Sequence, residues 1–133
     1  MSNPLTLSLL VGFGGFVGSL TRYGVSLLAQ RFVIDWPLGT FSANVLGCLT
    51  IGLVAGISAQ GETLTPAMRL ALTTGFCGGF TTMSSMIYET AEMIRASEYL
   101  HAGTYVAFTF ILSLSAFFTG LILIRYLTKL GGI

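Results

Sequence analysis

The chain has 133 residues, of which 53% are hydrophobic and only 8% are charged, with a formal net charge of +1. A soluble domain has about 25% charged residues, so this composition predicts a membrane protein. No basic cluster provides the positive surface that nucleic-acid binding requires, which excludes that class. Cys48 and Cys77 lie in apolar segments without a Cys or His partner at metal-binding spacing, so we interpret both as packing residues rather than disulfide or zinc ligands.

Four apolar segments are long enough to cross a bilayer, since a spanning helix needs about 20 such residues. They cover residues 5–29, 37–59, 66–94 and 102–126. The first is not expected to be a signal peptide, because no Lys or Arg precedes Arg22. We therefore predict an all-α, multi-pass membrane protein in which residues 1–133 form a single transmembrane domain.

The basic residues are divided almost evenly between the two ends of the predicted helices. The side that holds both termini carries Arg69, Arg125 and Lys129, and the other side carries Arg31 and Arg95, with Arg22 if it reaches that interface. A clear excess of Lys and Arg normally fixes the cytoplasmic side, and here there is almost none. The chain is therefore predicted to insert both ways up and to form an antiparallel two-fold homodimer, because closed symmetric pairs are the commonest assemblies.

Polar residues in the first two segments stand out against their apolar surroundings. Arg22 lies far into the first segment, where an arginine faces a water-filled vestibule or a partner, unless it extends to the interface. In the second segment one face repeats every four residues, through Thr40, Asn44, Cys48, Gly52 and Gly56. A buried amide in lipid needs hydrogen-bond partners, so Asn44 either joins helices or donates into a pore.

The third segment combines glycines with hydroxyl residues in its middle. Gly75, Gly78 and Gly79 are followed by Thr81, Thr82, Ser84 and Ser85. This density weakens a helix, and broken backbone at membrane depth is tolerated only where protein buries it or it lines a watery cavity. We predict a break in mid-membrane whose backbone groups hold an ion, with close helix packing through small residues as the alternative.

The fourth segment places Tyr105, Thr109 and Ser113 four residues apart, which makes a ladder of hydroxyl groups on one face. The alternative is that these hydroxyls bond to their own helix backbone. His101 is alone at an expected interface, and no Ser/His/Asp constellation or metal cluster is present in the sequence. The protein is therefore not expected to be an enzyme.

Together these residues resemble the Fluc (CrcB) family of fluoride channels. The family pattern has a Gly-rich first helix ending in Arg-Tyr, a Gly-Thr-x-x-x-Asn in the second helix, and Gly-x-Cys-Gly-Gly-x-Thr-Thr-Phe-Ser-Thr-Phe in the third. The matching stretches here are Gly15 to Tyr23, Gly39 to Asn44, and Gly75 to Met86, in the same order. The resemblance covers essentially the whole chain.

The resemblance implies a fluoride-selective channel that passively exports fluoride across the cytoplasmic membrane of a bacterium or archaeon and so lowers its toxicity. It also implies an antiparallel dual-topology homodimer with two pores, and a sodium ion at its centre held by backbone carbonyls, which by position belong to Gly78 and Thr81. Fluoride is strongly hydrated, so the pore must replace its water with donors. The residues expected along the path are Asn44, Met83, Ser84, Met86, Tyr105, Thr109 and Ser113, with Arg22 in the vestibule.

Met83 and Met86 are the departure from the family, because its two pore phenylalanines fall on these positions. An aromatic ring has a positive edge that can face an anion. Methionine can fill the same volume, but its sulfur is no hydrogen-bond donor and only weakly polarised methyl hydrogens can face fluoride. The substitution therefore changes the chemistry of the path and leaves the fold plausible.

Two other functional classes compete with the channel. A dual-topology small multidrug exporter is also a dimer of four-helix subunits, but proton-coupled export needs a carboxylate deep in the membrane. The first two segments contain none, and Glu89 lies toward the end of the third, where it is equally placed for a vestibule. A structural assembly subunit explains the small-residue stripes but not the aligned hydroxyls.

Overall fold

Capping residues and prolines set the ends of the first two helices. The computed structural model describes residues 3–32, 36–61 and 64–130, and the regular structure within these ranges is helical throughout. Helix α1 (Pro4–Ala29) begins after Asn3, whose side-chain oxygen accepts a hydrogen bond from the Leu5 amide at 3.0 Å. Helix α2 (Leu38–Ser58) follows Pro37, which cannot donate to a preceding turn.

The third predicted segment is divided into several elements. It contains α3 (Pro66–Leu70), the π-helical η1 (Ala71–Cys77), the short α4 (Gly78–Phe80) and α5 (Met83–Arg95). Between α4 and α5 the backbone of Thr81 and Thr82 is extended, with ψ angles of 157° and 113°. The Thr82 hydroxyl then caps α5 by accepting from the Ser85 amide at 3.1 Å.

A tight turn joins α5 to α6 (Tyr99–Leu130). Ser97 adopts a left-handed conformation with φ of 63°, its amide donates to the Ile94 carbonyl, and the Glu98 amide donates to the Met93 carbonyl. This pattern closes a helix efficiently and is usually made by glycine. Helix α6 therefore starts at Tyr99, earlier than the predicted position 102, and it ends at Leu130 rather than at 126.

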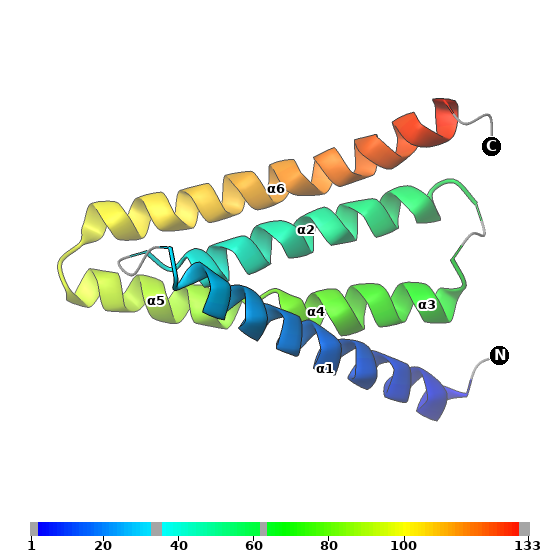
Figure 1. The fold of residues 1–133 in the computed structure, drawn as a ribbon, viewed down its shortest axis with the longest axis horizontal. Helices are drawn as coiled ribbons and strands as arrows, with labels where there is room; N and C mark the ends of the chain where they lie inside the picture. Colours follow the sequence, from blue (N-terminus) through cyan, green and yellow to red (C-terminus); the bar gives the residue numbers. More distant parts are fainter. Residues whose placement is uncertain (1–2, 33–35, 62–63, 131–133) are drawn as a thin grey trace.

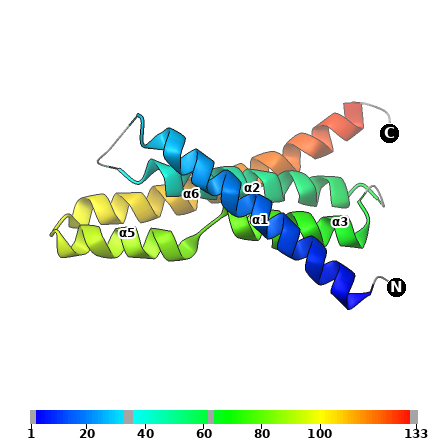
Figure 2. The ribbon, with the colours of Figure 1, turned by 60° about the horizontal axis from the view of Figure 1, so that its bottom comes forward.

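The helices run back and forth along one long axis (Figure 1). The start of α1, the end of α6 and the connection from α2 to α3 lie at the same end, and α5 meets α6 at the other end. Helix α1 crosses the others obliquely (Figure 2) and packs on η1 and α4, whereas α2 packs along α6. Within the described residues α1, α2 and α6 are long and apolar enough to span a membrane, as predicted. The other predicted segment is made up of α3, η1, α4 and α5, which lie in succession along the same axis (Figure 1).

Glycines let these helices approach closely. A Cβ added at Gly18 would lie 2.1 Å from the Phe76 carbonyl oxygen, and one added at Gly79 would lie 2.4 Å from the Gly15 carbonyl oxygen. On the other side, a Cβ at Gly52 would lie 2.1 Å from the Phe117 carbonyl oxygen. The small-residue stripe of α2 is therefore a packing surface for α6.

Replacing Gly52 with alanine should push α2 and α6 apart, because the new methyl would meet backbone that cannot rotate away. We expect a loss of about 1–3 kcal/mol, the usual cost of overpacking, measured as a lower midpoint in thermal unfolding of the detergent-solubilised protein. Gly103→Ala on α6 is the matched control: nothing lies within 4 Å of its added Cβ, and alanine favours helix. Equal midpoints for the two variants would contradict this close packing.

Candidate functional site

An inner cavity of about 370 Å³ lies among α2, α5 and α6. Five of the predicted path residues line it: Asn44, Met83, Met86, Thr109 and Ser113. Thr81 and Cys48 also line it, and the rest of its wall consists of apolar side chains of α2 and α6. The structure thus brings together, from three helices, residues that are up to 69 positions apart in the sequence, from Asn44 to Ser113.

Asn44 holds the extended backbone between α4 and α5. Its Oδ1 accepts from the Thr82 amide at 2.7 Å and its Nδ2 donates to the Thr82 carbonyl at 3.2 Å. One side chain therefore satisfies both backbone groups of a residue that is outside any helix, where unpaired groups would be costly. Asn44 therefore joins α2 to the connection between α4 and α5, and the same side chain also lines the inner cavity.

The three hydroxyl groups on one face of α6 differ in their hydrogen bonds. Tyr105 is fully buried and donates to Glu89, and the Thr109 hydroxyl donates to the Tyr105 carbonyl at 2.7 Å, the bond to its own helix that was the alternative. The Ser113 hydroxyl oxygen is buried and has no hydrogen-bond partner among the described residues. Ser113 is therefore the one of these three residues whose hydroxyl has no partner in the described part of the chain.

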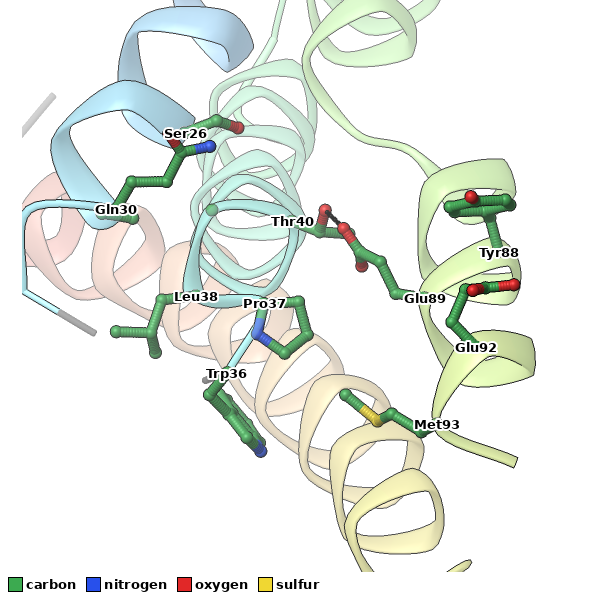
Figure 3. Close-up of a pocket in the computed structure, with 12 residues that line it drawn as sticks. Ser26, Gln30, Trp36, Pro37, Leu38, Thr40, Tyr88, Glu89, Glu92 and Met93 are labelled. Carbon is green, nitrogen blue, oxygen red and sulfur yellow. Dashed lines mark hydrogen bonds between the residues drawn. The ribbon is translucent and has the colours of Figure 1, made fainter. Parts of the chain in front are cut away.

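A second hollow, the end cavity, measures about 410 Å³ and lies where α1, α2 and α5 end or begin. Figure 3 shows Glu89 and Thr40 pointing toward each other across it. Thr40 donates to one Glu89 carboxylate oxygen and Tyr105 donates to the other, both at 2.6 Å. We call Thr40, Glu89 and Tyr105 the acid cluster. Trp36 also lines the end cavity and packs edge-on against Tyr105.

The acid cluster lies one helical turn from residues that line the inner cavity. Thr40 lies one helical turn before Asn44 on α2, and Tyr105 lies one turn before Thr109 on α6. Thr40 and Glu89 line the end cavity, while Asn44 and Thr109 line the inner cavity. Polar groups therefore follow one another from one hollow to the next along two facing helices.

Four of the predicted site residues lie outside the inner cavity. Tyr105 belongs to the acid cluster, and Arg22 is half-buried on α1, which packs on η1 and α4 rather than on α6. Ser84 is exposed and lies off the face that Met83 and Met86 share at helical spacing; its hydroxyl is 3.2 Å from the Thr82 hydroxyl. Gly78 is exposed at the start of α4.

The extended backbone releases two carbonyl groups from their usual helical partners. In a continuous helix the Thr82 amide would donate to the Gly78 carbonyl, but it donates to Asn44 instead. Likewise the Ser85 amide, which would donate to the Thr81 carbonyl, donates to the Thr82 hydroxyl. Gly78 and Thr81 are the two positions whose carbonyls were expected to hold sodium, and carbonyl oxygen is a suitable donor for such a hard cation.

Sequence reasoning noted Thr40 and Tyr105 on polar faces but did not connect them to Glu89. Glu89 is 49 residues from Thr40 and 16 from Tyr105, so no local pattern indicates the cluster. One general rule pointed to the cluster: a carboxylate in an apolar protein needs hydrogen-bond donors, and Thr40 and Tyr105 each carry a hydroxyl that needs an acceptor.

The sequence pattern described as CrcB-like protein, Camphor Resistance (CrcB), matches residues 9–121. The chain belongs to the CrcB-like family. Among its relatives, a protein of Chlorobium phaeobacteroides is 44% identical over 112 residues, which are 84% of this chain and 87% of the relative. A protein of Chlorobaculum tepidum is 44% identical over 117 residues, covering 88% and 93%, and one of Hyphomonas neptunium is 43% identical over 119 residues, covering 88% and 94%.

Each of these three CrcB-like relatives is named "Fluoride-specific ion channel FluC". The matches cover most of this chain and most of each relative. With three apolar helices of spanning length in the described residues, this CrcB-like chain is a multi-pass membrane protein.

Proposed function

We propose that this protein is a fluoride-selective channel that lets fluoride leave the cell passively across the cytoplasmic membrane. The observation that carries the proposal is the inner cavity, where Asn44, Thr109 and Ser113 meet Met83 and Met86 in a family whose relatives are named as fluoride channels. No chemical step is required. A passive path of this kind lowers intracellular fluoride and so protects the cell.

The proposed path runs through the inner cavity, along Asn44, Thr109 and Ser113. A small anion must exchange its water for donors of similar strength, yet bind weakly enough to leave. Ser113 has an uncommitted hydroxyl, and the Thr109 hydroxyl can exchange its backbone acceptor for the ion. The rest of the wall is apolar, and a partner chain that covers Met83 would keep competing water out of the passage.

The small multidrug exporter is less well supported as an alternative. Proton-coupled export needs a titratable carboxylate facing the substrate cavity, whereas Glu89 lies outside the inner cavity and already accepts from two hydroxyls. Helices α1 and α2 carry no Asp or Glu.

The proposal predicts that the purified chain, reconstituted into liposomes, releases fluoride without any pH gradient. Chloride should remain trapped at the level of protein-free liposomes, because the donors and the narrow apolar wall suit a small, strongly hydrated anion. A fluoride electrode and a chloride electrode measure the two releases side by side. Flux that appears only with an imposed pH gradient would instead support the exporter.

The functional unit is proposed to be an antiparallel homodimer. The end that holds the start of α1 and the end of α6 carries Arg69, Arg125 and Lys129, and the opposite end carries Arg31 and Arg95. This near-balance supports insertion in both orientations. Met83 is 72% exposed in the single chain although it lines the cavity, which leaves room for a partner chain to complete the wall.

Adding two or three lysines to the loop at residues 60–65 should force one orientation, because the added charge would keep that loop cytoplasmic. Expressed alone, this variant should lose fluoride flux, since an antiparallel pair needs both orientations. Co-expression with a variant carrying the same number of lysines beside Arg31, on the opposite end, should restore the flux. Full activity from either single-orientation variant alone would rule out the antiparallel dimer.

A sodium ion is proposed to lie at the dimer centre, held by the Gly78 and Thr81 carbonyls. The release of these two carbonyls from their helical partners fits such an ion. When bound, sodium would supply fixed positive charge that holds the extended backbone in place. The residues of the chain shape that backbone themselves, through the clamp of Asn44 on Thr82.

A further inference from the structure

Three sulfur-bearing side chains line the inner cavity. Cys48 comes from α2, and Met83 and Met86 come from α5. The chain has two cysteines and five methionines, so a substantial share of its sulfur is gathered at one hollow. Cys77, the other cysteine, is fully buried in η1 and lines neither the inner nor the end cavity.

The oxygen and nitrogen groups of the cavity are largely committed elsewhere. The Asn44 amide is bonded to Thr82, and the Thr81 and Thr109 hydroxyls donate to backbone carbonyls. No carboxylate or imidazole lines this cavity, and in the described part of the chain no three His, Cys, Asp or Glu residues are placed to hold a metal. Magnesium, calcium and zinc therefore lack their preferred ligands, whereas a thiolate with thioethers selects soft ions such as Cu(I).

We propose that the inner cavity binds one soft monovalent cation, Cu⁺ or Ag⁺, through the sulfurs of Cys48, Met83 and Met86. On binding, the Cys48 thiol gives its proton to water and its sulfur bonds to the metal, so one proton is released per ion and no electron is transferred. A thiolate with a monovalent cation is neutral overall, which suits an apolar wall; a divalent ion would leave an uncompensated charge.

The methionines have the freedom that this site requires. Within one chain Met83 is 72% exposed and Met86 is half-buried, so neither side chain is fully enclosed by its own subunit. Methionine has three rotatable bonds and adapts to irregular spaces, so both thioethers can turn toward an ion held by Cys48. The site does not depend on which anion the cavity conducts.

Silver nitrate titrated into the detergent-solubilised Cys77→Ser protein tests the site, because Cys48 is then the only thiol. The buffer must contain neither chloride nor added thiol. Calorimetry and proton release should show one Ag⁺ bound and one proton released per chain, and X-ray absorption should show more than one sulfur neighbour. Cys77→Ala provides the same background if the serine variant fails to fold.

Within this background, Cys48→Ser should abolish the proton release. Replacing Met83 and Met86 together with leucine keeps the volume but removes both thioethers, and should weaken silver binding at least about tenfold, or about 1.4 kcal/mol. Met68→Leu on α3, which lies outside the cavity, is the matched control and should change nothing. Equal affinity in the double leucine variant and its background would overturn the three-sulfur site and leave Cys48 as an ordinary thiol.

Discussion

Asn44→Asp should abolish fluoride flux while leaving the protein folded. The substitution places a carboxylate at the wall of the inner cavity, on the proposed anion path. Two like charges 4 Å apart repel by about 4 kcal/mol at an effective dielectric constant of 20, which corresponds to a rate about a thousandfold lower. The carboxylate can still accept from the Thr82 amide, so half of the clamp is retained.

Asn44→Ala separates the effect of charge from the loss of the clamp. It removes both hydrogen bonds to Thr82 without adding charge, and each buried backbone group left unpaired costs about 1–3 kcal/mol. We therefore expect a lower unfolding midpoint with reduced but measurable flux. The comparison uses the fluoride electrode for flux, and gel filtration with thermal unfolding for integrity. Persistent normal flux in Asn44→Asp would make Asn44 purely structural.

The spanning helices were predictable because lipid imposes a simple rule on sequence. Helices α1, α2 and α6 are long apolar runs, and no soluble fold would tolerate them so exposed. Their ends were harder to place. The start of α6 depends on the left-handed Ser97, a position where sequence reasoning looks for glycine and therefore finds no signal.

Residues that share one face of a helix could be predicted from the sequence, whereas contacts between helices could not. Spacing put Tyr105, Thr109 and Ser113 on one face, and the family resemblance placed Met83 and Met86 with Asn44. The clamp of Asn44 on Thr82 joins residues 38 positions apart, and the acid cluster joins three helices. Such contacts depend on how α5 packs against α2 and α6. The spacing of residues along a single helix does not predict that packing.

The methionines are the second position where a large effect is expected. Changing both Met83 and Met86 to phenylalanine should give a functional fluoride channel, because the rings fill a similar volume and offer a positive edge to the anion. Changing both to alanine should instead enlarge the cavity, admit water and remove the narrow apolar passage. In that variant chloride should leak measurably beside fluoride.

The three proteins are compared by fluoride and chloride release from liposomes, with Met68→Ala as a control that shortens a methionine outside the cavity. Truncating a buried methionine costs about 2–5 kcal/mol of unfolding free energy. Met83 is 72% exposed in the single chain, so Met83→Ala should cost that much only if a partner chain buries the side chain. A large drop in the unfolding midpoint for Met83→Ala alone would therefore support the dimer, and no drop would place Met83 at a surface that no partner covers.

Equal fluoride release and equal exclusion of chloride in the wild type and both double variants would show that these side chains do not line the path. The ion would then have to pass the break between α4 and α5 on another side, away from Asn44, Thr109 and Ser113.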